Sequence, residues 1–292
     1  SRVGADLVIA HDPDADRMAL AAPGPDGEPA MLSGNQVGIL LAHYLLEQSE
    51  ATPGRLVVST LVSTPLIEEI ARFHGARWEC TLTGFKWICN RALQLERESG
   101  ARFVFGFEEA LGYTAGRLVR DKDGIGSALL AADLAAWCKQ RGVTLHQELE
   151  RAAHLYGMVQ SRSLSFPFEG SRAAERMARA MDRERSSASE RIGEHRVVAL
   201  WDLRRGVRRR EDGVEEPVAL PASDVLLFEL GGGHRVILRP SGTEPKLKLY
   251  FHLRRPRHPA GDEKIVARRA ERDLQRLVDA FLRHLEARVV HR

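Results

Sequence analysis

Carboxylates on alternate residues are the first feature of the sequence that could take part in binding or catalysis. Residues 11–17 read HDPDADR and lie between two short apolar stretches that are typical of strands. Asp12, Asp14 and Asp16 are therefore expected to share a loop at a strand end. Oxygen-only ligands of this kind favour a hard cation, and Mg²⁺ suits a site that keeps positions for water or a substrate phosphate. A plain acidic turn is the competing interpretation.

A loop rich in proline and glycine is the second feature. Residues 239–245 read RPSGTEP and stand between two strand-like stretches. The guanidinium of Arg239, the hydroxyls of Ser241 and Thr243, and the backbone N–H groups around Gly242 are groups that hold a phosphate dianion. The same composition also suits an ordinary hairpin loop.

Three further segments carry weaker signals. Glu108 lies in FEEALGY, directly after an apolar stretch, where a carboxylate can accept hydrogen bonds from sugar hydroxyls. Lys86 ends TGFK at the start of a predicted helix, where the helix dipole favours an anion. Lys122 lies in the charged turn RDKDG. Taken alone, each also fits a solvated side chain.

The elements that must position these residues follow from hydrophobic periodicity. Strand-like and helix-like stretches alternate through residues 31–152, which predicts an α/β, three-layer α/β/α domain with a mostly parallel sheet. Residues 153–292 contain shorter strand-like stretches and a charged helical stretch at 171–194, which predicts a smaller α+β C-terminal domain. An amphipathic helix is expected over 262–288. Its apolar face is predicted to hold Ile265, Leu274, Leu277, Val278, Phe281 and Leu285.

Composition excludes several classes of protein. Of 292 residues, 43% are hydrophobic and 28% charged, which is typical of a globular chain. The absence of an apolar run near the roughly 20 residues of a membrane span predicts no membrane partner, and the absence of a signal core predicts a cytoplasmic protein. The arginine-rich segment 204–210 is followed at once by acids, so we expect a solvated turn and no nucleic-acid partner. The three cysteines form no CxxC pair and are expected to be packed thiols.

Taken in order, these segments resemble the motifs of the α-D-phosphohexomutase family, the phosphoglucomutases and phosphomannomutases. DPDADR resembles the family's DGDADR magnesium loop, TGFK its domain-three loop, and FEEALGY its GEESG-type sugar-binding loop. DKDG resembles the charged turn that follows, and RPSGTEP the C-terminal phosphate loop. By this resemblance residues 1–30 are the tail of domain 2, 31–152 are domain 3, and 153–292 are domain 4.

The resemblance implies a reaction and a role for each residue. A phosphoserine donates to a sugar phosphate, a bisphosphate intermediate reorients, and the serine recovers the other phosphate, with Mg²⁺ and a sugar bisphosphate activator as cofactors. The implied roles are Mg²⁺ ligation by Asp12, Asp14 and Asp16; catalysis by Arg17, which contacts the phosphoserine, and by Lys86; and substrate binding by Glu108, Lys122, Arg239, Ser241, Gly242 and Thr243.

Three departures from the family pattern shape the remaining expectations. The family's nucleophile lies in a TASHNP-like motif, and this sequence has no Ser-His pair, so we expect the N-terminal phosphoserine domain to be missing and the isolated chain to be inactive. Pro13 stands in place of a loop glycine. Ala110 stands where many relatives have a sugar-contacting serine, which leaves glucose, mannose and pentose phosphates open as substrates.

Two alternatives remain open from the sequence. One is a sugar-phosphate-binding module without catalysis. The other is a haloacid-dehalogenase-like phosphatase with Asp12 as its nucleophile and Asp14 as its general acid, which would also recruit Ser59, Lys86 and Glu108 but would leave RPSGTEP unexplained.

Overall fold

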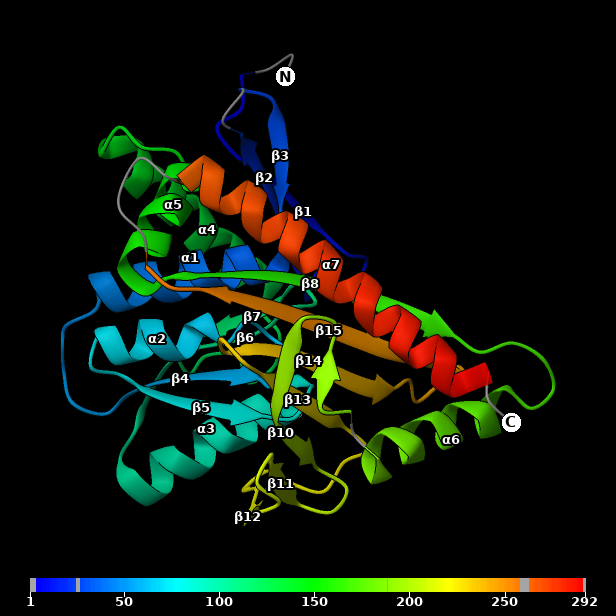
Figure 1. The fold of residues 1–292 in the computed structure, drawn as a ribbon. Coiled ribbons are helices and arrows are strands. Elements are labelled where there is room, and N and C mark those ends of the chain that lie inside the picture. The colour runs from blue at the N-terminus through cyan, green and yellow to red at the C-terminus, as the bar shows by residue number, and fades with distance from the viewer. Residues whose placement is uncertain (1–3, 25–26, 188, 258–262, 291–292) are drawn as a thin grey trace. The chain divides into compact units, whose positions relative to one another are not determined.

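The computed structural model describes residues 4–24, 27–187, 189–257 and 263–290 (Figure 1). The chain divides into two compact units. The first contains the residues up to 158 together with 256 and 257, and the second contains residues 159–255 and the C-terminal helix. The segment predicted as a domain-2 tail, residues 1–30, falls within the first unit.

A small antiparallel sheet opens the first unit. It has the order β1 (Val8–His11), β2 (Met18–Pro23) and β3 (Pro29–Leu32). Four residues of β2 are buried, as its apolar sequence predicts: Met18, Leu20, Ala21 and Ala22. The acidic loop connects β1 to β2, as the sequence predicts.

A four-stranded sheet forms the centre of the first unit, in the order β5 (Arg77–Thr81), β4 (Arg55–Thr60), β6 (Arg102–Glu108) and β7 (Gly112–Ala115). The strand β4 pairs in parallel with β5 and with β6, and every residue of β4 is buried. This confirms the predicted, mostly parallel sheet. The exception is β7, which turns straight back and pairs antiparallel with β6.

Helices complete three layers around this sheet. The helix α3 covers one face, while α1 and α2 lie on the other (Figure 1). The α3 layer packs through a buried apolar cluster with β4 and β6 that includes Val58, Ile88 and Phe103. The helices of this unit are α1 (Gly34–Gln48), α2 (Leu66–Phe73), α3 (Phe85–Ser99), α4 (Gly124–Gln140) and α5 (Leu145–Tyr156).

Capping boxes start two of these helices. At α1 the Ser33 side chain accepts from the Gln36 N–H while the Gln36 side chain accepts from the Ser33 N–H. Thr144 and Gln147 make the same exchange at α5. The helix α5 was not predicted, although its capping signal is present in the sequence.

The second unit is built on an eight-stranded, largely antiparallel sheet with the order β12-β11-β10-β13-β14-β15-β8 and with β9 paired to β10. Two helices pack on it, α6 (Ala173–Ser186) and α7 (Glu263–Val290). The α+β prediction is confirmed. The strands are β8 (Met158–Pro167), β9 (Arg191–Ile192), β10 (His195–Asp202), β11 (Val207–Arg210), β12 (Glu215–Pro217), β13 (Leu226–Leu230), β14 (His234–Pro240) and β15 (Lys246–Arg255).

Three local predictions for the second unit were wrong in part. The charged helix ends at Ser186 rather than at residue 194, because the chain beyond it forms β9. The segment 204–210 is only partly a turn, since β11 pairs with β10 and its arginines form ion pairs with acids such as Glu216. Ile265 is 69% exposed although the other five predicted residues of the α7 face are buried.

Two further observations concern burial. Of the cysteines, Cys89 and Cys138 are buried free thiols and Cys80 is half-buried. Among the described residues, none of the helices is long and apolar enough to cross a membrane.

Candidate functional site

The acidic loop is a tight turn organised around its first aspartate. The Asp12 carbonyl accepts from the Ala15 N–H at 3.0 Å, and the Asp12 Oδ1 accepts from the Arg17 N–H at 3.2 Å. The Arg17 Nε lies 3.7 Å from Asp12 and 3.9 Å from Asp16. The loop thus presents carboxylates with one guanidinium beside them.

The acidic loop and the FEEALGY segment lie against each other. Arg17 forms a β-bridge with Gly112, and the Met18 N–H donates to the Leu111 carbonyl at 3.1 Å. Ala15 and Leu111 are the two non-glycine residues with positive φ in the described part of the chain, at 53° and 65°. Strained backbone of this kind costs about 1 kcal/mol per residue and concentrates at functional sites.

Lys122 joins a third segment to this group. Its Nζ lies 3.0 Å from the Asp16 Oδ2 and 3.1 Å from the Asp121 Oδ1. Burial alone would lower the pKa of Lys122, but its hydrogen bonds to the two aspartates raise that pKa above the ordinary value. The ammonium also lies 5.6 Å from the centre of the Phe85 ring, which belongs to TGFK. Lys122 is therefore a charged lysine that bridges the acidic loop to the charged turn.

Glycines permit this close packing. A Cβ on Gly124 would lie 2.5 Å from the Ala15 carbonyl oxygen and 2.9 Å from that of Arg17. A Cβ on Gly112 would lie 2.7 Å from the Phe85 ring and 3.1 Å from the Lys122 side chain. Only a residue without a side chain lets the start of α4 and the start of β7 reach these positions.

Glu108 and Glu109 are adjacent in the chain, and Glu109 is tied to Ser63. The Ser63 hydroxyl donates to the Glu109 Oε2 at 3.2 Å and accepts from the Glu109 N–H at 3.1 Å. Glu108, predicted as the sugar ligand, is half-buried at the end of β6. Lys86 is exposed in the first turn of α3, with its Nζ 5.5 Å from the centre of the Trp87 ring.

The acidic loop has a donor set that fits Mg²⁺. It offers carboxylate oxygens, and the Asp16 Oδ1 is buried without a hydrogen-bond partner, so one hard-cation donor is left over. In the described residues, however, Asp12, Asp14 and Asp16 do not bring their ligand atoms within 4.8 Å of one another. The loop therefore contains suitable ligands in a more open arrangement than a closed metal cage.

The RPSGTEP loop of the second unit is open. The Ser241 N–H donates to the Lys246 carbonyl at 2.9 Å, and the hydroxyls of Ser241 and Thr243 lie 3.5 Å apart. Gly242 and Thr243 are exposed, and a Cβ on Gly242 would meet nothing within 4 Å. The backbone of Gly242 does not have positive φ, so neither conformation nor protein packing requires glycine there.

A residue that sequence reasoning missed lies next to this loop. Lys248 of β15 is directly opposite Arg239 of β14, so both cations point to the same face of the sheet. Like charges opposite each other in a sheet are destabilising unless an anion compensates them. The basic residue two positions after Lys246 was the available signal, but its register with Arg239 is set by the hairpin and could not be read from the sequence.

The fold and these loops define an α/β protein that gathers acidic, basic and hydroxyl groups suited to a phosphorylated ligand. Two family models match the chain: "Phosphoglucomutase/phosphomannomutase, alpha/beta/alpha domain III" over residues 33–156, and the C-terminal domain of the same family over residues 204–259. The chain belongs to the α-D-phosphohexomutase family, which contains the phosphoglucomutases and phosphomannomutases.

Individual relatives agree with this assignment. The chain is 35% identical over 253 residues to a phosphoglucomutase of Staphylococcus epidermidis. The aligned region covers 86% of this chain and 46% of that protein. It is 34% identical over 266 residues to a phosphoglucomutase of Staphylococcus aureus, and this alignment covers 90% of this chain and 47% of that protein. The chain thus spans about half the length of the curated relatives it matches.

Solved structures share the fold. The Paramecium phosphoprotein parafusin, a phosphoglucomutase, matches with a TM-score of 0.60 and 16% identity over 94% of this chain and 45% of its own. A phosphoglucomutase/phosphomannomutase family protein of Burkholderia thailandensis matches with a TM-score of 0.57 and 18% identity over 97% of this chain and 47% of its own.

Proposed function

We propose that the chain is the ligand-gripping part of a phosphohexomutase, which interconverts a sugar 1-phosphate and its 6-phosphate through a phosphoserine and a bisphosphate intermediate. The observation that carries this proposal is that the acidic loop contacts two motifs about 100 residues later in the first unit. Lys122 contacts Asp16, and Arg17 pairs with Gly112. In a chain of this family, these contacts place the metal loop, the sugar loop and the charged turn side by side.

In this proposal the first unit supplies the groups that neutralise the negative charge of the phosphoryl group during its transfer. Asp12, Asp14 and Asp16 would hold Mg²⁺, which neutralises negative charge that develops on the transferring group. Arg17 contacts the phosphoserine, and the cation of Lys122 lies beside the same loop.

The other groups orient the sugar. Glu108 accepts hydrogen bonds from its hydroxyls, and Lys86 lines the same domain. Holding the sugar at its hydroxyls turns binding energy into orientation of the reacting hydroxyl.

The second unit holds the phosphate that is not reacting. Arg239 and Lys248 supply two positive charges, while Ser241 and Thr243 supply hydroxyl donors. The exposure of Gly242 and the empty space where its Cβ would lie support this assignment, because no protein atom blocks an anion from approaching on that side. The serine nucleophile is proposed to come from an N-terminal domain outside these 292 residues.

The sheet topology disfavours the phosphatase alternative. Asp12 follows β1, which belongs to the antiparallel sheet of β1, β2 and β3, whereas Ser59 and Glu108 lie on the central sheet. These residues belong to one unit but to two sheets, which favours the mutase over the phosphatase.

Phosphorus NMR tests the proposal. The chain alone, and the chain fused to the N-terminal half of the Staphylococcus epidermidis phosphoglucomutase, are each mixed with glucose 1-phosphate, Mg²⁺ and a trace of glucose 1,6-bisphosphate. We expect glucose 6-phosphate from the fusion only, and saturable bisphosphate binding by both. Arg239→Ala should remove both signals, while Arg210→Ala, which changes an ion-paired arginine of β11, should keep them.

Other outcomes contradict the proposal in distinct ways. Saturable binding with no conversion by the fusion favours a non-catalytic sugar-phosphate-binding module. Steady release of inorganic phosphate by the chain alone favours a phosphatase. Mannose 1-phosphate and ribose 1-phosphate, run in parallel, identify the preferred sugar.

A further inference from the structure

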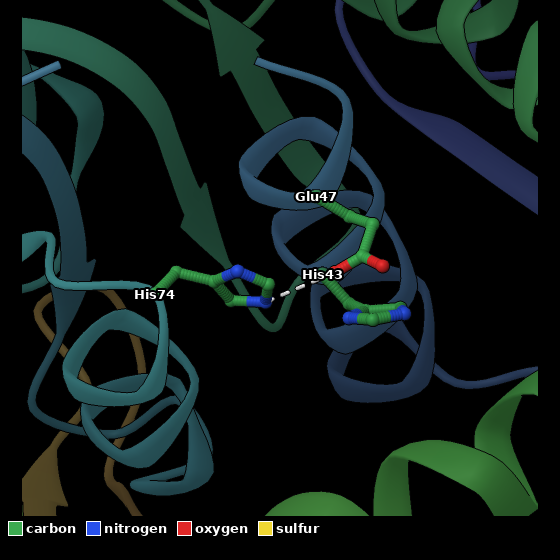
Figure 2. A group of neighbouring side chains, drawn as sticks. All are labelled: His43, Glu47 and His74. Carbon is green, nitrogen blue, oxygen red and sulfur yellow. Dashed lines mark ion pairs between the residues drawn. The ribbon is translucent and has the colours of Figure 1, made fainter. Parts of the chain in front are cut away.

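A cluster of two histidines and one glutamate in the first unit belongs to none of the motifs above. His43 and Glu47 are four residues apart on α1 and so share one helix face, and His74 is the C-cap residue that follows α2. One ligand atom from each of the three lies within 4.8 Å of the others. The Glu47 carboxylate faces the His74 ring, and the His43 ring lies next to that carboxylate (Figure 2).

We propose that His43, Glu47 and His74 form a binding site for a divalent transition-metal ion of the Zn²⁺ type, which links the C-terminal ends of α1 and α2. Two imidazoles and one carboxylate are a ligand set that Zn²⁺ uses with a fourth position left for water. Imidazole nitrogen selects such ions over Mg²⁺, which prefers oxygen.

The surroundings of His43 match those of a metal-binding histidine. Its ring is fully buried, and its Nε2 lies 2.9 Å from the Glu148 Oε1, an acceptor that is itself 1% exposed. Because a carboxylate only accepts, the Nε2 carries the proton and the lone pair of a neutral His43 is on Nδ1. A carboxylate on the outer nitrogen is the usual partner that fixes the tautomer of a metal-binding histidine.

The inner nitrogens already face a common point. The Tyr156 hydroxyl lies between them, 2.7 Å from the His43 Nδ1 and 3.0 Å from the His74 Nε2, so a bound ion would take the place of this hydroxyl. The Glu47 Oε2 lies 3.9 Å from the His74 Nε2.

Access comes from the side of Glu47. Its side chain is 36% exposed, whereas that of His74 is 9% exposed. An ion can therefore enter beside the carboxylate and reach the two buried nitrogens without unfolding the helices.

The guanidinium of Arg151 should weaken metal binding, so its replacement tests the direction of the predicted change in affinity. The Arg151 Nη2 lies 3.9 Å from the Glu47 Oε1, and its Nη1 lies 3.5 Å from the His43 Nε2. A guanidinium at this range repels a divalent cation. Replacing it with a neutral side chain should strengthen metal binding by about tenfold, since partial burial limits screening by salt.

The experiment is a titration of the metal-free chain with Zn²⁺ by calorimetry, and with Co²⁺ by visible absorption. We expect one saturable Zn²⁺ site and the intense Co²⁺ absorption of a four-coordinate site. Glu47→Gln and His74→Gln should each weaken this component by at least about 100-fold, from the loss of one of three ligands. Glu50→Gln and His146→Gln, which change the same residue types outside the cluster, should leave it unchanged.

Stability gives a second readout. At a Zn²⁺ concentration about 100 times the dissociation constant, the unfolding midpoint of the wild-type unit should rise by about 5–10 °C, and that of Glu47→Gln should not. Glu47 is a partly exposed surface residue, so this variant keeps the fold. Absence of a saturable site, equal affinity in Glu47→Gln, or weaker binding in Arg151→Gln would each overturn the proposal.

Discussion

The acidic loop of the first unit is tied to distant segments of the chain, whereas the RPSGTEP loop of the second unit is held mainly by local contacts and is exposed at Gly242 and Thr243. In the acidic loop, Lys122 forms an ion pair with Asp16 and Arg17 forms a β-bridge with Gly112. The backbone of Gly124 lies so close to the loop that a side chain there would clash. The RPSGTEP loop has a short internal hydrogen bond and open space at Gly242. In the proposed function, the acidic loop would gain from such preorganisation because it holds carboxylates in place, whereas the RPSGTEP loop would complete its contacts when a phosphate binds.

Gly124→Ala should have the largest effect on the free energy of unfolding, because it disrupts the packing of the acidic loop. The new methyl would lie 2.5 Å from the Ala15 carbonyl oxygen, so the acidic loop or the start of α4 must move. Overpacking of this kind costs about 1–3 kcal/mol, and we expect the upper part of that range in urea unfolding. Gly142→Ala does not serve as a control because of its positive φ, whereas Gly242→Ala does. An unchanged midpoint for Gly124→Ala would show that the loop is not locked.

Glu96→Gln should lower the free energy of unfolding by about 2 kcal/mol, because it breaks the link between α3 and the charged turn. The Glu96 carboxylate accepts from Arg117 at 2.7 Å and from Arg120 at 2.8 Å. Burial alone would raise the pKa of Glu96, but these two hydrogen bonds lower it below the ordinary value of 4.5.

The sign of the pH dependence follows from that lowered pKa. The stability that Glu96 contributes is present above pH 4.5 and is lost as the pH falls through the lower pKa of the folded state. The gap between wild type and Glu96→Gln should therefore narrow below pH 4.5 in unfolding curves measured from pH 7 to pH 3. Glu98→Gln is the control, and a gap that stays constant would contradict the ion-pair origin.

Lys248→Met should weaken binding of glucose 1,6-bisphosphate by about tenfold, since one charge-assisted contact of about 1.4 kcal/mol is removed. Stability in the absence of ligand should stay the same or rise slightly, because the repulsion from Arg239 is relieved. Calorimetry and urea unfolding of the same preparations separate these effects. A loss of stability without a loss of affinity would remove Lys248 from the phosphate site.

Gly242→Ala should have the smallest effect on stability, within about 0.5 kcal/mol of wild type, because the added methyl meets no protein atom within 4 Å. Its effect should be on the ligand, with a several-fold loss of bisphosphate affinity where the methyl crowds the backbone N–H groups. Affinity equal to that of wild type would show that the anion does not approach this backbone.

Local sequence patterns predicted the elements well and the contacts between them poorly. Alternation and helical spacing identified β4, α1 and α4 because such signals arise within about a dozen residues. The contact between Asp16 and Lys122 joins residues 106 positions apart, so only the fold brings them together. His43 belonged to a predicted helix, but its partner Glu148 lies on α5, which was not predicted.

The order of strands in the second unit has a consequence for biosynthesis. The first strand of its sheet, β8, takes its place beside β15, the last strand, and α7 then packs on β15. Sheet closure therefore waits for residues made about 90 positions later, whereas the central sheet of the first unit is complete by β7. During synthesis the first unit can finish folding earlier, while β8 of the second unit stays without its sheet neighbour until β15 has been made.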